Sequence, residues 1–349
     1  MKEKPGLYGI KNSNRDFTQK SSWGKNQFNS SFPASLSAYL SSKNLDNNYI
    51  KLNNDLKIEH KTITTKDLFG IDPKDDNIFY AFESSHNPFQ QFVIGTLPRV
   101  DLVIQDKRTG NCLNGIEIKL TALPDNTTCN LSENNYGSEI VIRPDTIVYL
   151  ACSIVENFKT RQTDLQKYFP QKFNKIKDWT EIDSIIPYIN EMITILDKIS
   201  LELISFQKPI VMQPIGKSPR LAENCLDVFV WSDLGFMQLF LDAGRNKKIT
   251  KINRQIRTIV WLFKMIFEFS KDGQFNHHKI IDELSYNTKN DKAFAVSGIV
   301  THPYMQSDNL TKPRITKDEL KNIIIGGGQN LLSPERRFDA IIYNSPELF

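Results

Sequence analysis

The sequence has only four cysteines, and they are scattered along the chain. Cys112, Cys129, Cys152 and Cys225 form neither a Cys-x-x-Cys pair nor a Cys/His cluster with the spacing of a zinc site. A disulfide framework and a structural zinc site are therefore not indicated. We expect reduced, partly buried thiols in a cytoplasmic protein.

The sequence also lacks a long uninterrupted apolar run. Its amino terminus has no apolar segment of the kind found in signal peptides. The longest strongly apolar stretch, Ile256 to Phe269, contains Arg257, Lys264 and Glu268, so it is too short and too charged to span a bilayer. We expect no membrane partner.

Neither sign of charge dominates. Lys and Arg together number 44 against 40 Asp and Glu, which gives a net charge of +4 and a pI near 8.6. This balance permits a nucleic-acid partner without arguing for one, because DNA binding needs local positive surface and not a large total. The 40% of hydrophobic residues, with 22 Phe and 11 Tyr, are enough for a sizeable core.

The 349 residues contain no internal repeat and no clear linker. Residues 1–32 are rich in Asn, Ser, Lys and Gly, and they predict an arm or loop region that is either mobile or wrapped on a partner. Residues 33–349 predict a single elaborated domain that begins with a short helix over 33–40. Its most informative part runs from about residue 75 to 155.

The spacing of apolar residues predicts a mixed α/β fold. For the informative part we expect a helix over 77–92, a hairpin of strands 100–105 and 115–121 with a turn at 107–111, a strand at 139–142, and a helix from Arg143. Further along we expect a helix over 178–206 kinked at Pro187, strands over 210–213 and 226–231, a helix from Ser232 to Leu241, a helix over 252–269 and a strand over 338–343.

Three charged residues of the predicted hairpin point to phosphodiester hydrolysis. Asp101 interrupts the first apolar strand, while Glu117 and Lys119 lie two positions apart on the second and so share a face. Carboxylates that hold Mg²⁺ neutralise an anionic phosphate and help to activate water, and a nearby lysine orients or deprotonates that water or balances charge. Glu83, on the predicted upstream helix, is a further catalytic candidate that completes the acidic set.

The spacing by itself leaves two interpretations open. An acid and a base at positions i and i+2 are common on the wet face of an antiparallel sheet, so Glu117 and Lys119 are also explained as solvated strand residues. The position of Asp101 inside an otherwise apolar strand, shortly after Pro98, favours a site.

Three segments carry more information than the spacing. They are Pro98-Arg99-Val100-Asp101, Glu117-Ile118-Lys119-Leu120-Thr121-Ala122-Leu123-Pro124-Asp125 and Ser333-Pro334-Glu335-Arg336-Arg337-Phe338-Asp339. The first two resemble the active-site region of HindVP-type type II restriction endonucleases, and the third resembles a segment of the same family. The resemblance extends over most of the chain.

This resemblance implies a PD-(D/E)xK restriction-endonuclease-like core, with a mixed sheet flanked by helices, helical additions and a catalytic core around residues 75–155. It implies Mg²⁺-dependent hydrolysis of double-stranded DNA at a short palindromic site, with the degenerate hexamer GRCGYC associated with the family, leaving 5′-phosphate and 3′-hydroxyl ends. Asp101, Glu117 and Lys119 take the motif's D, E and K roles, with Asp101 and Glu117 as metal ligands. The motif's proline is displaced, since Arg99 and Val100 intervene, but it has no chemical role.

A palindrome has two equivalent strands, so the expected assembly is a homodimer with two equivalent active sites. A cognate DNA methyltransferase is the expected genetic partner, because the host's own sites need modification. Asp125 is best explained as a turn residue, although its nearness to Lys119 keeps it as a candidate helper.

The densest basic run lies around the start of the helix predicted over 252–269. On a helix, Lys251, Arg254 and Arg257 share a face that suits phosphate contacts, and a solvated helix face explains them equally well. Four further DNA-binding candidates lie elsewhere, and no spacing rule selects among them. They are Lys217, Arg220, Arg336 and Arg337.

Two other functions remain open at this point. One is a structure-specific PD-(D/E)xK nuclease of repair or junction resolution. The other is a non-catalytic DNA-binding protein in which the Asp101, Glu117 and Lys119 set is accidental.

Overall fold

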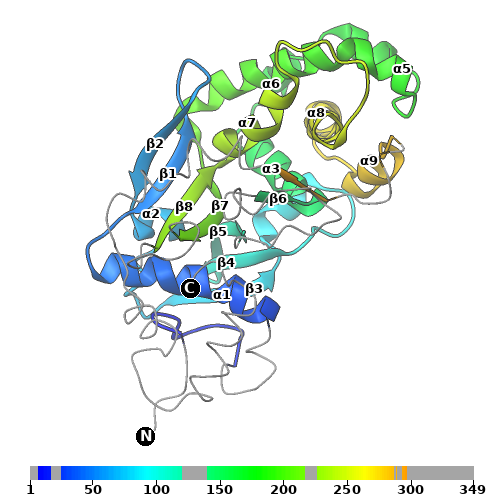
Figure 1. The fold of residues 1–349 in the computed structure, drawn as a ribbon. Coiled ribbons are helices and arrows are strands. Elements are labelled where there is room, and N and C mark those ends of the chain that lie inside the picture. The colour runs from blue at the N-terminus through cyan, green and yellow to red at the C-terminus, as the bar shows by residue number, and fades with distance from the viewer. Residues whose placement is uncertain are drawn as a thin grey trace, which may run out of the picture.

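A seven-stranded mixed sheet lies at the centre of the protein (Figure 1). The computed structural model describes residues 7–16, 25–119, 140–216, 226–286, 288 and 293–296. The sheet has the order β2-β1-β8-β7-β5-β4-β3, in which β1/β8 and β5/β7 are parallel and the other neighbours antiparallel. Its strands are β1 (Asn47–Leu52), β2 (Ile58–Ile63), β3 (Ile78–Ser84), β4 (Val100–Asp106), β5 (Asn111–Ile118), β7 (Pro209–Gly216) and β8 (Leu226–Ser232). A separate antiparallel pair joins β6 (Ile140–Ile142) and β9 (Phe294–Val296).

Helices cover both faces of this sheet (Figure 1). The α-helices are α1 (Lys25–Ser42), α2 (Thr65–Phe69), α3 (Pro144–Glu156), α4 (Gln162–Gln166), α5 (Ile182–Ile185), α6 (Ile189–Leu203), α7 (Asp233–Gly244), α8 (Arg254–Asp272) and α9 (His277–Glu283). Short 3₁₀ helices are found at Asn87–Phe92, Gln171–Lys175, Ile186–Tyr188 and Ile204–Phe206. With its mixed sheet between helical layers, the chain has the predicted α/β class.

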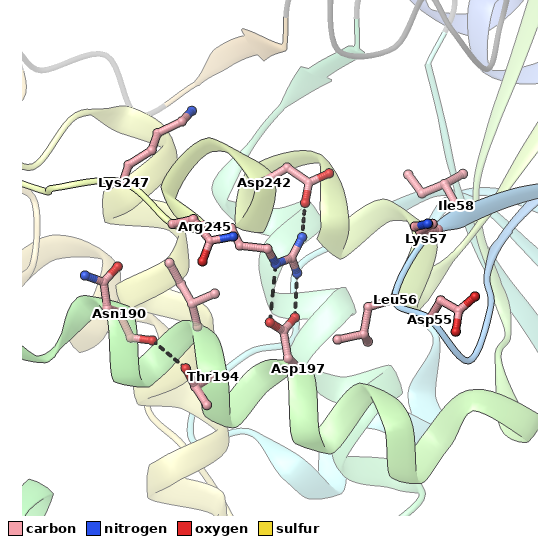
Figure 2. Close-up of a pocket in the computed structure, with 12 residues that line it drawn as sticks. Asp55, Leu56, Lys57, Ile58, Asn190, Thr194, Asp197, Asp242, Arg245 and Lys247 are labelled. Carbon is pink, nitrogen blue, oxygen red and sulfur yellow. Dashed lines mark hydrogen bonds and ion pairs between the residues drawn. The ribbon is translucent and has the colours of Figure 1, made fainter.

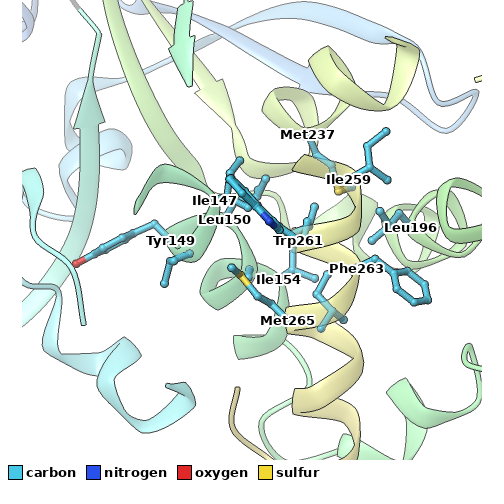
Figure 3. Packing of buried hydrophobic residues seen from close by; sticks show 14 of the residues in the cluster. Ile147, Tyr149, Leu150, Ile154, Leu196, Met237, Ile259, Trp261, Phe263 and Met265 are labelled. Carbon is cyan, nitrogen blue, oxygen red and sulfur yellow. The ribbon is translucent and has the colours of Figure 1, made fainter. Parts of the chain in front are cut away.

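Each face of the sheet has its own core. On one face, α1 and α2 pack against inward side chains such as Leu102 and Ile116. On the other, α3, α6, α7 and α8 form the larger core, in which the rings and thioethers of α8 lie between the neighbouring helices (Figure 3). Trp261 of α8 is 1% exposed and packs among aliphatic residues of α3, such as Leu150 and Ile154.

Local signals account for several of the helix boundaries. The Ser232 hydroxyl accepts a 2.9 Å hydrogen bond from the backbone of Gly235 and starts α7, and the Asn253 side chain does the same for α8. Gly273, with φ 72°, ends α8 in the left-handed conformation that favours glycine. The helix predicted over 178–206 is present with its break at Pro187, where a 3₁₀ turn separates α5 from α6.

The predicted hairpin is confirmed as β4 and β5, with Gly110 at φ 70° in the turn. The helix predicted over 77–92 is wrong, because the chain forms β3 there and then a 3₁₀ helix over Asn87–Phe92. The residues of β3 from Ile78 to Phe82 are all apolar and mostly buried, so apolar and polar residues do not alternate there, and the period of two was hidden.

Part of the predicted arm packs on the sheet. Residues 7–16 lie against β3 of the same chain, with Leu7 and Ile10 buried, and α1 begins at Lys25 and not at residue 33. The strand predicted over 338–343 lies outside the described residues. None of the helices in the described part of the chain is long and apolar enough to cross a membrane.

Candidate active site

The antiparallel strands β4 and β5 bring Asp101 and Glu117 together. Their register pairs Leu102 with Ile116, and its continuation by one residue places Asp101 opposite Glu117 on the same face of the sheet. The Asp101 Oδ2 atom accepts a hydrogen bond of 2.7 Å from the backbone N–H of Ile118, which holds the carboxylate against β5. The two predicted acids therefore lie on one face, at one end of the central strands.

The two carboxylates are held close together in a partly buried place. Burial, and after it the negative charge of Glu117, raise the pKa of Asp101 to about 7, while the Lys119 cation and the Ile118 hydrogen bond act in the opposite direction. A proton on Asp101 relieves the repulsion, and a bound cation would relieve it too. Such a pair of acids is typical of a functional site.

Lys119 lies directly beside these acids. Its Nζ atom donates a hydrogen bond to Glu117 Oε1 at 2.5 Å, and the side chains of the two residues are only 9% and 12% exposed. The backbone N–H of Lys119 donates to the Met212 carbonyl at 2.9 Å, so the parallel neighbour β7 holds this residue just beyond the end of β5. The prediction that Glu117 and Lys119 project to the same side is confirmed.

Helix α3 adds Thr146, a residue that sequence reasoning missed. Its hydroxyl donates to Glu117 Oε1 at 3.2 Å, and the residue is 1% exposed. Partial burial, and then the charge of Glu117, raise the pKa of the neighbouring Asp145. The sequence indicated the start of this helix, but no spacing connects Thr146 with Glu117, because the contact depends on how α3 packs on the sheet.

Glu83 lies on the edge strand β3 and not on the predicted helix. It sits between two residues that pair with Leu102 and Val100, so it is opposite Asp101 in the register. Its φ of 49° falls in the left-handed region, which residues other than glycine adopt rarely. Its side chain is 50% exposed, and Oε1 lies 3.5 Å from Nη2 of Arg15.

The oxygen ligands of this site fit a magnesium ion. Mg²⁺ is commonly held by one or two carboxylates together with water and substrate phosphates, and Asp101 and Glu117 supply two carboxylates on one face. In the parts of the chain that the structure describes, no three or more His, Cys, Asp and Glu side chains are close enough to hold a metal ion between them. Glu83 therefore does not form such a group with Asp101 and Glu117.

The three basic residues predicted to share a helix face are separated. Lys251 is exposed but precedes α8, and Arg254 is the first residue of that helix. Arg257 is 0% exposed: its guanidinium lies 4.5 Å from the ring centroid of Trp261 and donates to the carbonyl and hydroxyl of Thr288. The prediction of a shared basic face is wrong. Lys251 lies outside the helix, and Arg257 lies on the side of α8 that is buried in the core.

Arg245, earlier in the same basic run, is engaged by two acids (Figure 2). Its Nη2 atom lies 2.6 Å from Asp197 Oδ1 and 2.6 Å from Gln238 Oε1, and Nη1 pairs with Asp242. Lys247 extends away from these ion pairs (Figure 2). Arg245, its partners Asp197 and Asp242, and Lys247 line an open pocket of about 870 Å³ between the β1–β2 turn, α6 and α7.

Several sequence candidates lie outside the described residues. They are Lys217, Arg220, Arg336 and Arg337, which were predicted to bind DNA, and Asp125, the candidate helper.

Similarity to known proteins shows the family of this chain. A protein-family model described as HindVP restriction endonuclease matches residues 23–349. The chain is 48% identical over 354 residues to "Probable type II restriction enzyme HindVP" of Haemophilus influenzae, covering 100% of this chain and 96% of the relative. It is 46% identical over 349 residues to "Type II restriction enzyme HgiDI" of Herpetosiphon aurantiacus, covering 99% of this chain and 97% of the relative. No solved structure was found to match.

The family match spans β4 and β5 with Asp101, Glu117 and Lys119, together with the helices that cover them. The resemblance inferred from the ExKLTALPD run and the carboxy-terminal segment is confirmed, and the mixed sheet between helices is the α/β core expected from it. The chain belongs to the HindVP restriction endonuclease family.

Proposed function

We propose that this chain is a type II restriction endonuclease that hydrolyses phosphodiester bonds of double-stranded DNA at a short palindromic site. The reaction requires Mg²⁺ and leaves 5′-phosphate and 3′-hydroxyl ends. The observation that carries the proposal is the placement of Asp101 opposite Glu117, with Lys119 bonded to Glu117 at 2.5 Å. The names of both relatives, which are called type II restriction enzymes, support the same activity.

Each residue of the site has a role in this proposal. Asp101 and Glu117 would hold Mg²⁺, which neutralises charge on the scissile phosphate and assists the attack of water. The Ile118 N–H orients the first carboxylate and the Thr146 hydroxyl the second. The Lys119 ammonium, fixed beside Glu117, orients the nucleophile and stabilises the charge that develops on the phosphate.

The partners follow from the same proposal. A palindrome such as GRCGYC presents two equivalent scissile bonds, which a homodimer reaches with two equivalent sites. Lys251 and Arg254 are candidates for phosphate contacts on the described surface. A cognate DNA methyltransferase would protect the host's own sites.

Cleavage of plasmid DNA tests this function. We expect discrete fragments in the presence of Mg²⁺ and none in EDTA. Lys119→Ala should reduce the cleavage rate by roughly 100-fold or more, because one preorganised group next to a developing charge contributes about that much. The matched control is Lys264→Ala, which removes another partly buried lysine that pairs with a glutamate, at 3.3 Å on α8.

The form of the products separates the alternatives. Smeared products or cutting only of branched DNA would indicate a structure-specific nuclease. DNA that binds but stays intact would indicate a non-catalytic protein. A Lys119→Ala variant that cuts at the wild-type rate would remove Lys119 from the site.

A further inference from the structure

The amino-terminal segment continues the sheet beyond β3. The Tyr80 N–H donates to the Asn12 carbonyl at 2.9 Å, and the Asn14 N–H donates to the Tyr80 carbonyl at 3.4 Å. The Asn14 side chain bonds the backbone of Phe82 in both directions, accepting from its N–H at 2.9 Å and donating to its carbonyl at 2.8 Å. These hydrogen bonds fix residues 12–14 against β3 up to Phe82, which directly precedes Glu83.

The next residue of the segment, Arg15, is held by several contacts. Its side chain is only 9% exposed. The guanidinium carbon lies 4.6 Å from the ring centroid of Phe82, and the guanidinium donates to Ser30 Oγ at 2.7 Å and to Ser31 Oγ, both on α1. Its position is therefore set by β3 and α1 together, and not by a flexible arm.

The guanidinium faces the acids of the site. Nη2 lies 3.5 Å from Glu83 Oε1. Burial lowers the pKa of Arg15 to about 10, and the negative charges of Glu83 and then Asp101 act in the opposite direction, which places Asp101 within electrostatic reach of Arg15. Burial of an arginine is unfavourable unless acids compensate it, and Glu83 and Asp101 contribute such compensation here.

Glu83 is the link between Arg15 and the site. It lies opposite Asp101 in the strand register and keeps a left-handed φ of 49°, a strained conformation that persists only where the surroundings hold it. The Asn14 bonds on one side of the kink and the Arg15 ion pair at its side chain provide that restraint.

We propose that Arg15 is a positioning residue of the nuclease site, which holds the Glu83 carboxylate beside Asp101 and acts on catalysis through it. The amino-terminal segment then forms part of the active site. In the strand register, Glu83, Asp101 and Glu117 form a row of three acids across β3, β4 and β5. Arg15 pairs with Glu83 and Lys119 with Glu117, so the two cations compensate the negative charge at the two ends of the row. The proposal rests on the proposed nuclease function, and it assigns a role to a residue far from the motif in the sequence.

A double-mutant cycle tests whether Arg15 acts through Glu83. Single-turnover cleavage with Mg²⁺ is measured for Arg15→Gln, Glu83→Gln and the double variant, and DNA affinity is measured with Ca²⁺ in place of Mg²⁺. We expect each single substitution to slow cleavage roughly 10- to 100-fold, as for other residues that orient the groups of a metal site, with DNA affinity unchanged. The double variant should be no slower than the slower single variant, because both remove the same interaction.

Two further variants serve as controls. Lys11→Gln lies on the same segment and removes only an exposed ion pair with Asp76, at 3.4 Å and with 76% and 85% of the side chains exposed, so it should cleave at the wild-type rate. Arg15→Lys keeps the charge and should recover part of the rate. A melting temperature for each variant identifies any loss of folding, and if Arg15→Gln does not fold, Arg15→Lys takes its place in the cycle.

The proposal is overturned if the two substitutions multiply in the double variant, or if either single variant cleaves at the wild-type rate. These outcomes differ from a failure of the nuclease function itself, in which the wild-type protein leaves DNA uncut before any variant is compared.

Discussion

Replacement of Asp101 by asparagine removes a carboxylate that the metal-free fold holds at a cost. The pKa of Asp101 is raised from 3.8 to about 7, chiefly by burial and by Glu117. At about 1.4 kcal/mol per unit, a difference of roughly three units sets a ceiling of about 4 kcal/mol on that cost above pH 7. Asparagine keeps an oxygen for the 2.7 Å bond from the Ile118 N–H, so the substitution loses little else.

The pH dependence of this cost follows from the direction in which the pKa of Asp101 is shifted. A pKa raised in the folded state means that folding favours the protonated acid, so this contribution to stability is fully present below the ordinary value of 3.8 and is lost as the pH rises through about 7. We expect Asp101→Asn to stabilise the protein at pH 8 by about 1–3 kcal/mol, since relaxation and solvent reduce the ceiling. The gain should shrink at pH 5.5.

The assay is thermal unfolding in EDTA at the two pH values, where each kcal/mol corresponds to about 2 °C for a chain of this size. Mg²⁺ should raise the melting temperature of the wild type and have less effect on the variant, because Asp101 is a proposed ligand. Asp106→Asn, at the other end of β4, is the matched control: hydrogen bonds from Arg108 lower the pKa of Asp106, so its removal should not stabilise the protein. A variant at Asp101 that melts at or below the wild-type temperature at pH 8 would falsify the account of this site.

Three further outcomes follow from single contacts. Thr146→Val removes the 3.2 Å bond to Glu117 and should slow the cleavage step roughly tenfold with DNA affinity unchanged, as measured by single-turnover kinetics and by DNA binding in Ca²⁺. Arg257→Ala should lower the free energy of unfolding by about 3 kcal/mol through the cavity it leaves, while the salt dependence of DNA binding stays the same; a smaller salt slope would place this arginine at the DNA. Gly115→Ala should destabilise the fold by about 1–3 kcal/mol in chemical denaturation, because the added Cβ would lie 2.9 Å from the Cβ of the buried His86.

The hairpin that carries the site was predictable because its signals are local. The alternation around Asp101 and the glycine at position 110 set the strands and the turn, and the two-residue spacing of Glu117 and Lys119 put them on one side. The spacing did not separate a site from solvated strand residues. The low exposure of Glu117 and Lys119 and the burial of Asp101 exclude solvated strand residues, and both depend on the whole sheet.

The rest depended on packing between segments far apart in the chain. Glu83 was expected on a helix, but it lies on β3, whose residues are mostly apolar and read like a helix; its catalytic role stays a prediction. Thr146 and Arg15 have no local signal, because each meets its acid only after α3 and the amino-terminal segment dock on the sheet. Arg257 is the opposite case, because its sequence position in a basic run indicated a surface residue but its side chain is buried in the core.

Three unfavourable features of this fold lie together at one end of the sheet. Asp101 is a buried acid beside another acid, Glu83 adopts a strained φ of 49°, and the cation of Arg15 is largely removed from water. Each lowers the stability of the metal-free chain, whereas the side-chain caps of α7 and α8 agree with the fold. Because natural sequences depart from such agreement chiefly where function requires it, this arrangement argues for the site independently of the motif. Relief of these costs by Mg²⁺ and DNA would then contribute to binding, so stabilising substitutions here should weaken it.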